Sequence, residues 1–133
     1  MKKIISALML CGTSIASFAS TPDQLIVQKS FETATRTISK QMERCYSDSG
    51  FLVGGFHVFD DIDYDAKTGE VLYQVSGLAG KKTAVTVSIT EKQTGEEAAE
   101  TVITVSSGGA LYNSTARRIH KQIDRWMAGD RGC

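Results

Sequence analysis

The chain has 133 residues, with 15 Lys and Arg against 15 Asp and Glu, and 41% of its residues are hydrophobic. This length suits one domain, and this hydrophobic content is typical of a protein with an ordinary core rather than of a disordered chain. The formal net charge of zero argues against a protein that binds nucleic acid by neutralising phosphates. The three cysteines lack the CxxC spacing of zinc and thioredoxin-like redox sites.

Residues 1–19 have the pattern of a secretory signal peptide. A basic start, Met1-Lys2-Lys3, precedes an uncharged apolar stretch, and Ser17 and Ala19 place small residues at −3 and −1 of a cleavage site after Ala19. The apolar stretch is shorter than the about 20 residues of a membrane span, so a retained anchor is the weaker alternative. We therefore expect residues 20–133 to form one exported domain in a bacterial periplasm.

Lipid attachment at Cys11 is a second alternative for this leader. Lipoprotein signals normally place a small residue directly before the cysteine, whereas Leu10 is large. The apolar run before Cys11 is also short, so we expect cleavage after Ala19 rather than lipidation.

A first helix is predicted from the N-cap Ser30 to a point near Tyr46. Glu32 lies in its first turn, where a negative charge suits the helix dipole. Apolar residues recur at helical spacing along it: Phe31, Ala34, Ile38, Met42 and Cys45. Arg36 and Lys40 fall outside that stripe.

Four segments with a period of two predict strands: 51–65, 71–75, 84–90 and 101–105. The turn between the first two spans 65–69, with Gly69 available for a positive φ. Close spacing and turn residues favour an antiparallel meander over parallel βαβ units. The short apolar run Leu25–Val27 is a further edge strand that we expect to pair with Thr101–Val105.

A last helix is predicted after Gly108-Gly109, with Gly129 as its stop. One apolar stripe follows helical spacing: Leu111, Tyr112, Ala116, Ile119, Ile123 and Trp126. The expected fold class is α+β, an antiparallel four- to five-stranded meander sheet with two helices packed on one face.

An acidic patch is expected at Asp61, Asp63 and Asp65, which alternate along the first long strand. Their spacing resembles a calcium loop, but Ala66 and Leu72 stand where an EF-hand needs Gly and Glu. Alternate strand residues are also about 6.8 Å apart, so the three carboxylates do not converge. We therefore expect a solvated strand face and no metal or cofactor.

The two histidines, His57 and His120, belong to different predicted elements, and no catalytic triad or H-E-x-x-H pattern surrounds them. An acid–base pair of His57 with Asp61 would require both side chains to share one cleft. We therefore expect a protein that is not an enzyme, and we name no catalytic residue.

A basic stripe on the last helix, Arg117, Lys121 and Arg125 together with Arg118, is the candidate ligand or partner contact. It could touch an acidic partner or anionic lipid head groups, although Asp124 interrupts it and most charged helix faces are only solvated.

Removal of the leader leaves an even pair of cysteines, Cys45 and Cys133, in an oxidising compartment. We expect these two to form a disulfide. In a simple meander the C-terminal ends of the two helices lie at opposite ends of the domain. A bridge within one chain therefore requires the tail to fold back, and a bridge between two chains is the alternative.

Met42-Glu43-Arg44-Cys45 closes the first helix, and an Asp-rich strand, a meander and a last segment with Trp126 and Cys133 follow. This arrangement resembles a family of small, uncharacterised bacterial envelope proteins labelled BPTD family lipoproteins. The likeness covers most of residues 20–133 through short motifs. It implies an envelope location and pairing of Cys45 with Cys133, while the context of Cys11 departs from a lipoprotein signal.

These features favour a non-enzymatic periplasmic protein that binds another envelope protein or associates with itself, without nucleic acid and without a membrane span after processing. The alternative is a carrier of a small apolar or lipid-like ligand, because the layout is loosely similar to helix-grip folds. Such a carrier would need a cavity lined by Phe31, Ile38, Tyr73 and Ile119.

Overall fold

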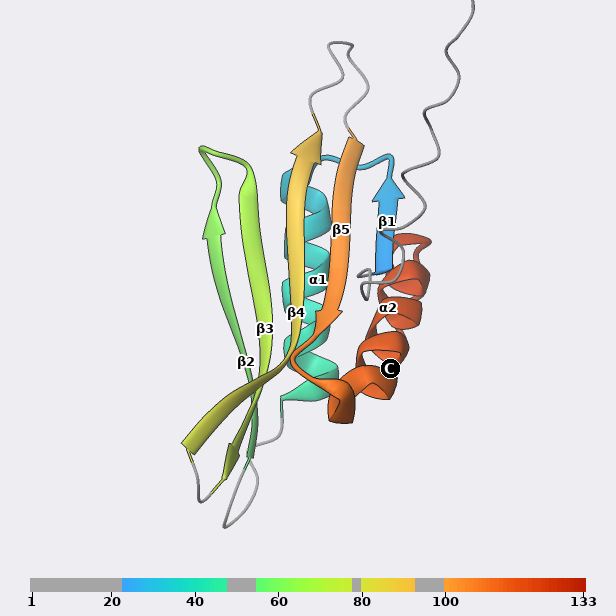
Figure 1. The fold of residues 1–133 in the computed structure, drawn as a ribbon. Coiled ribbons are helices and arrows are strands. Elements are labelled where there is room, and N and C mark those ends of the chain that lie inside the picture. Colours follow the sequence, from blue (N-terminus) through green and yellow to red (C-terminus); the bar gives the residue numbers. More distant parts are fainter. Residues whose placement is uncertain (1–22, 48–54, 78–79, 93–99) are drawn as a thin grey trace, which may run out of the picture.

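The computed structural model describes residues 23–47, 55–77, 80–92 and 100–133. Five strands form one antiparallel sheet in the order β1-β5-β4-β3-β2, and both helices cover the same face of it (Figure 1). The elements are β1 Asp23–Val27, α1 Phe31–Tyr46, β2 Gly55–Asp63, β3 Thr68–Gly77, β4 Gly80–Lys92, β5 Glu100–Ser107, the 3-10 turn η2 Ala110–Tyr112, and α2 Asn113–Met127. The expected α+β class is confirmed.

Several sequence-based expectations lie outside the described residues. These are the signal peptide at 1–19 with Cys11, the start of the first long strand at 51–54, and the turn at 93–95. Within the part of the chain that is described, no helix has the length and apolar character needed to cross a membrane.

Helix α1 begins and ends where its sequence predicts. The Ser30 side chain accepts a hydrogen bond from the Thr33 N–H, which satisfies one of the free donors of the first turn. At the other end the Ser47 N–H donates to the Glu43 carbonyl. Phe31, Ala34, Thr35, Ile38, Gln41 and Met42 form its buried face.

The edge position of β1 is also confirmed. β1 pairs antiparallel with β5, and Asp23 lies opposite Val105 and Val27 opposite Thr101. The buried Thr101 hydroxyl donates to the Lys29 carbonyl at 2.6 Å, so it ties the connection between β1 and α1 to the sheet.

The hairpin between β2 and β3 differs from the prediction. β2 ends at Asp63, because the Asp63 carboxylate accepts the N–H groups of Asp65 and Ala66, each at 3.0 Å, and so folds the chain into a turn. Lys67 takes the positive φ, 58°, while Gly69 lies in β3 against Ile62. The placement of Asp65 in the strand and of Gly69 in the turn is therefore wrong.

Most of the predicted apolar stripe of α2 is confirmed, but the prediction is wrong for Leu111. Its side chain is 80% exposed, because the 3-10 turn before α2 rotates it away from the sheet. Ala116, Ile119, Ile123 and Trp126 are buried as expected. Gly129 has a φ of 106° and follows the end of α2, as the sequence predicts for a helix stop.

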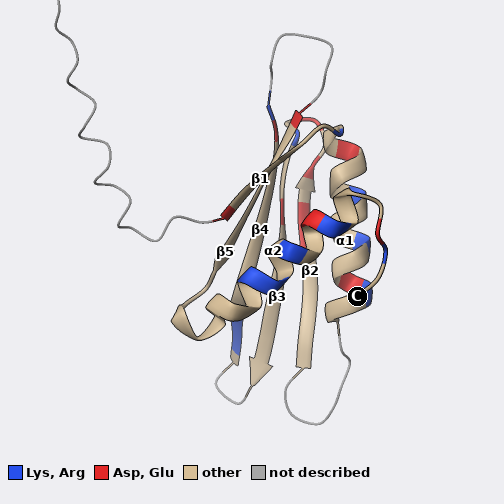
Figure 2. Ribbon diagram, turned by 90° about the vertical axis from the view of Figure 1, so that its right-hand side faces the viewer, with Lys and Arg blue, Asp and Glu red and all other residues tan. Residues whose placement is uncertain are grey.

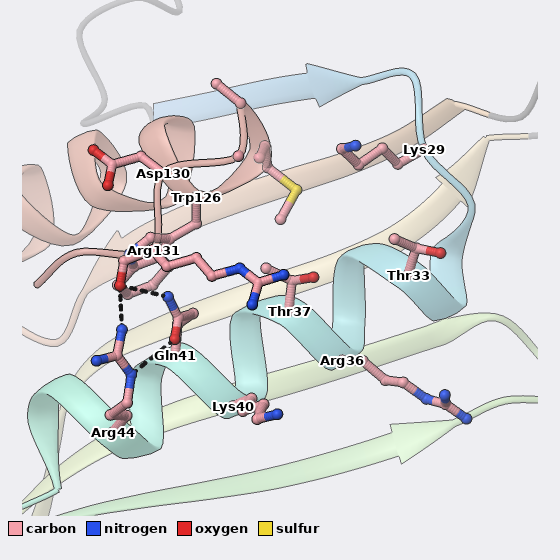
Figure 3. A pocket seen from close by; sticks show the side chains of 13 residues that line it. Lys29, Thr33, Arg36, Thr37, Lys40, Gln41, Arg44, Trp126, Asp130 and Arg131 are labelled. Carbon is pink, nitrogen blue, oxygen red and sulfur yellow. Dashed lines mark hydrogen bonds between the residues drawn. The ribbon is translucent and has the colours of Figure 1, made fainter.

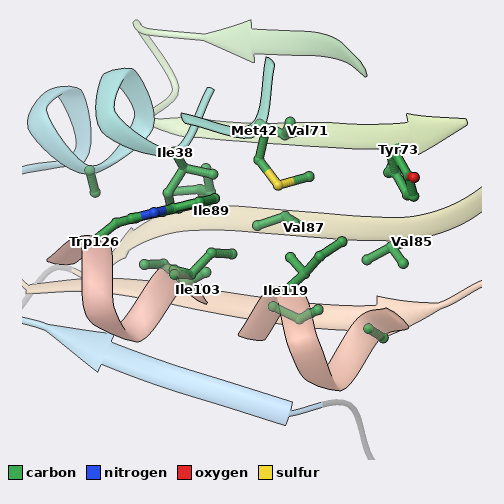
Figure 4. Close-up of a cluster of buried hydrophobic side chains, with 14 of the residues drawn as sticks. Ile38, Met42, Val71, Tyr73, Val85, Val87, Ile89, Ile103, Ile119 and Trp126 are labelled. Carbon is green, nitrogen blue, oxygen red and sulfur yellow. The ribbon is translucent and has the colours of Figure 1, made fainter. Parts of the chain in front are cut away.

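The core lies between the two helices and the sheet. Ile38 and Met42 from α1 and Ile119 and Trp126 from α2 point into this layer (Figure 4). The strand residues that meet them come from β3, β4 and β5: Val71, Tyr73, Ala84, Val85, Val87, Ile89, Ile103 and Val105. The opposite face of the sheet has no helix over it in the described structure.

Candidate binding groove

A disulfide joins Cys45, near the end of α1, to Cys133, with their Cα atoms 5.6 Å apart. The expected pairing is confirmed, and it lies within one chain. After Gly129 the chain turns back from the end of α2, which brings Cys133 to the end of α1. We call residues 128–133 the tail.

Contacts with α2 hold the tail in this course. The Trp126 indole N–H donates to the Gly132 carbonyl at 2.9 Å, and the Gln122 amide donates to the Cys133 carbonyl. The Asp130 carboxylate accepts the Gly132 N–H at 2.9 Å and the Arg125 guanidinium at 2.8 Å. The hydrogen bond from Gly132, followed by the hydrogen bond and charge of Arg125, lowers the pKa of Asp130 below its ordinary value.

Contacts with α1 hold the other side of the tail. The Gln41 amide donates to the Arg131 carbonyl at 3.1 Å, and the Arg44 guanidinium donates to the same oxygen (Figure 3). The Nε of Arg44 also donates to the Oε1 of Gln41 at 3.0 Å. Two side chains one helical turn apart thus converge on a single carbonyl of the tail.

Between α1 and the tail lies a groove with a volume of about 770 Å³. Its lining side chains include Thr33, Thr37 and Gln41 of α1, and Trp126 and Met127 of α2. Five cationic residues line it: Lys29, Arg36, Lys40, Arg44 and Arg131. The carboxylate of Asp130, which is paired with Arg125, is the acidic group among the lining residues. We call this feature the basic groove.

The residues that line the basic groove carry a net positive formal charge, five cations against the single carboxylate of Asp130. Arg36 forms an exposed pair with Glu32 at 3.1 Å, and such a pair is worth little in water. Arg44 donates to uncharged oxygens and so retains its full charge. Figure 3 shows the Arg131 side chain extending over α1 toward Thr37.

The basic groove was not predicted from the sequence, although the helical spacing of its α1 residues is present there. Thr33, Arg36, Thr37, Lys40 and Arg44 stand at i, i+3, i+4, i+7 and i+11, which places them on one side of α1. The second wall comes from a tail whose folded-back course depends on the disulfide and on the Gln41 and Arg44 hydrogen bonds. No local pattern in the sequence specifies that course.

The predicted basic stripe lies elsewhere. Arg117, Lys121 and Arg125 are exposed on α2, and none of the three lines the basic groove. Figure 2 shows the blue Lys and Arg positions along α2. Arg125 is engaged by Asp130. The structure therefore contains two separate groups of cations. One is exposed on α2, and the other lines the basic groove along α1 and the tail.

The predicted acidic patch is divided. Asp61 and Asp63 line a second, smaller hollow of about 490 Å³ on the uncovered sheet face. Its other lining residues are Thr68, Gly69, Glu70, Ser88 and Thr90. Asp65 lies instead in the turn after β2. Across the described residues no three His, Cys, Asp or Glu side chains are grouped closely enough to hold a metal ion.

His57 and Asp61 lie on the same face of β2 but four residues apart, which corresponds to about 13 Å along a strand. Phe59 lies midway between them along β2, and the centre of its ring is 6.3 Å from the centre of the His57 ring. Asp61 lines the smaller hollow and His57 does not. The described structure thus does not bring the two together within one chain.

The four residues named for a carrier cavity all belong to the packed core. Phe31, Ile38, Tyr73 and Ile119 are each at most 9% exposed, and none of them lines either of the two hollows. The alternative of an apolar carrier gains no support from these two hollows.

No protein-family model, no curated protein and no solved structure matches this chain.

Proposed function

We propose that this protein is a non-enzymatic, periplasmic binding protein whose basic groove takes an acidic, extended segment of another envelope protein. The observation that carries the proposal is the basic groove itself, which is lined by five cationic residues and by one carboxylate that is already paired. Electrostatic complementarity of this kind selects a ligand of opposite charge and speeds its encounter.

The shape of the basic groove favours an extended ligand over a single small ion. Its α1 wall runs from Thr33 to Arg44, which is about 17 Å at 1.5 Å per helical residue. An extended peptide covers that length with about five residues. Hydroxyls of Thr33 and Thr37 add hydrogen-bonding groups suited to a peptide backbone.

A protein partner suits this surface better than a membrane does. Membrane-binding faces combine cations with exposed large apolar side chains that enter the lipid. The exposed large apolar residues of the described structure are Ile26, Phe56, Phe59, Tyr64 and Leu111. None of them lines the basic groove.

The Cys45–Cys133 disulfide supports the proposed compartment, since disulfides persist in oxidising environments such as the periplasm. It also supports the proposed role, because it fixes the wall that carries Arg131 before any ligand arrives. A preformed wall reduces the entropy cost of binding.

Trp126 provides a direct assay, because it is the single tryptophan of the chain and lines the basic groove. Titration with octaglutamate should change its fluorescence in a saturable way, and added salt should weaken the binding. Inorganic phosphate and vesicles with anionic lipids serve as the competing small-ion and membrane probes. Stronger binding to either of these than to octaglutamate would overturn the proposal.

A matched pair of variants locates the binding. Lys40→Gln with Arg131→Gln removes two charges from the basic groove, and the Arg131 carbonyl that Gln41 and Arg44 contact remains. We expect the affinity for octaglutamate to fall roughly tenfold, since each lost charge contact is worth up to about 1 kcal/mol. Arg117→Gln with Lys121→Gln removes the same charge from α2 and should leave the affinity nearly unchanged. An equal loss in both variants would contradict binding in the groove.

A further inference from the structure

We propose that the protein forms a symmetric dimer in which β2 pairs antiparallel with β2 of a second copy, about a two-fold axis at Phe59. β2 is the last strand of the sheet order and is nine residues long, Gly55–Asp63. Its outer edge pairs with no other strand in the described structure (Figure 1). Such an edge exposes backbone donors and acceptors that can template pairing with another chain.

The side chains of β2 are complementary to themselves in this one register. With Phe59 opposite its own copy, His57 of each protomer lies opposite Asp61 of the other, so two histidine–carboxylate pairs form. An imidazole has an N–H that can donate to a carboxylate in either protonation state. Phe56 lies opposite Ile62 of the other copy, so two apolar residues meet on the helix-covered face. Phe56 is 40% exposed in the single chain.

Cross-strand aromatic and opposite-charge pairs are the contacts that stabilise antiparallel strands. The Phe59 side chain is 45% exposed on the uncovered face, so the axis would cover an apolar surface. Asp60 lies opposite Val58 in this register, and its carboxylate is already held by the Ser39 hydroxyl at 2.6 Å. No carboxylate of β2 then lies opposite another.

Neighbouring registers are less complementary. An axis at Asp60 would still set His57 opposite Asp63, but it would place two Asp60 carboxylates directly against each other, which is unfavourable for paired strands. An axis at Val58 would place His57 opposite Phe59 and leave Asp60 opposite Phe56. The charges of β2 therefore select the register as well as the partner.

The other edge of the sheet does not offer the same match. β1 has five residues, and pairing with itself about Leu25 would set Asp23 opposite Val27 with no charge partner. Pairing of β1 with β2 of another copy would be heterologous and would not close into a dimer. A second copy joined through β2 is a closed, isologous assembly, and it is independent of the basic groove.

Single cysteines placed along β2 test the register directly. Cys11→Ser serves as the background, so that the introduced thiol is the only cysteine besides the Cys45–Cys133 bridge. Phe59→Cys should form a disulfide dimer under mild oxidation, because directly opposed antiparallel residues have Cα atoms about 4.5–5.5 Å apart, within disulfide range. His57→Cys alone and Asp61→Cys alone should not, because each residue is then about 13 Å from its copy. A mixture of these two variants should cross-link.

Thr104→Cys is the matched control, because Thr104 lies on the same uncovered face but in β5. Its cross-linking would show that two sheets stack face to face, which would overturn the proposal. Failure of Phe59→Cys to cross-link while the protein remains folded by circular dichroism would also overturn it.

Charge exchange provides a second, reversible readout by sedimentation. His57→Asp places a carboxylate opposite Asp61 in both cross-strand pairs of the dimer. This repulsion should raise the dimer dissociation constant about tenfold. Addition of Asp61→Lys to the same chain restores opposite charges in both pairs and should recover dimerisation. A dimer that is indifferent to both changes, or a protein that stays monomeric in its native form, would contradict β2 pairing.

Discussion

Gly108, between β5 and the turn before α2, lies where the backbone of β4 leaves no room for a side chain. A Cβ at this position would lie 2.0 Å from the Thr83 carbonyl oxygen, and the Gly108 N–H donates to the Ala84 carbonyl at 2.7 Å. Backbone atoms of a central strand cannot move aside as a flexible side chain can.

Gly108→Ala should therefore lower the free energy of unfolding by about 2–4 kcal/mol, as measured by urea denaturation. Gly109→Ala is the neighbouring control, because a Cβ there meets nothing within 4 Å. It should change stability by less than about 0.5 kcal/mol. Equal losses in the two variants would show that the close approach of β4 is not the cause.

The lowered pKa of Asp130 leads to a prediction of how the tail responds to acid. Its pKa is lowered in the folded protein, so its contacts with Gly132 and Arg125 are present above the ordinary pKa and are lost as the pH falls through the lowered value. The Gly132 amide signal in NMR should titrate with a midpoint below 3.8, the ordinary value. Asp130→Asn should abolish this titration. A midpoint at or above 3.8 in the native protein would contradict the contacts.

At the scale of elements, the disulfide is the strongest link between α1 and the tail. It closes a loop between residues 88 apart, which the chain-entropy model values at about 4–5 kcal/mol. The double variant Cys45→Ser with Cys133→Ser should lose stability of that order in urea denaturation. It should also bind octaglutamate more weakly, because Arg131 is no longer fixed beside α1.

Reduction of the native protein is the control for this double variant, since it breaks the same bond without changing the sequence. It should reproduce both losses. A protein that keeps its stability and its affinity in both cases would show that the Gln41 and Arg44 hydrogen bonds hold the tail alone.

Local patterns predicted the elements well and their ends less well. Periodicity and the Ser30 cap located α1, and the apolar run at Leu25–Val27 located the edge strand and its partner. The ends of β2 and α2 depended on contacts that periodicity does not encode: the Asp63 carboxylate that folds its own turn, and the 3-10 turn that exposes Leu111.

The binding surface was harder to predict than the fold, because its walls are distant in sequence. The sequence drew attention to Arg117 and Lys121, whose charges are adjacent along one helix. Lys40 and Arg131 meet at one groove only after the tail has folded back. A reversal of that kind depends on tertiary contacts of Trp126 and Cys133 rather than on local propensity.

At the scale of the whole molecule, the formal net charge of zero conceals a separation of charge. Five cations line the basic groove beside α1, whereas Asp61, Asp63 and Glu70 line a hollow on the uncovered face of the sheet. A field of this shape can orient a charged partner even when the net charge is zero. The two surfaces lie on opposite faces of the sheet, so a dimer through β2 would leave the basic groove accessible and would engage Asp61 at the rim of the acidic hollow.

The most direct measurement is an amide-resolved NMR titration of the native protein with octaglutamate. Binding in the basic groove should shift signals of α1 between Thr33 and Arg44 and of the segment from Trp126 to Cys133, with little change at Arg117 and Lys121. Shifts centred on the outer side of α2, or no saturable shifts at all, would contradict a binding site in the basic groove.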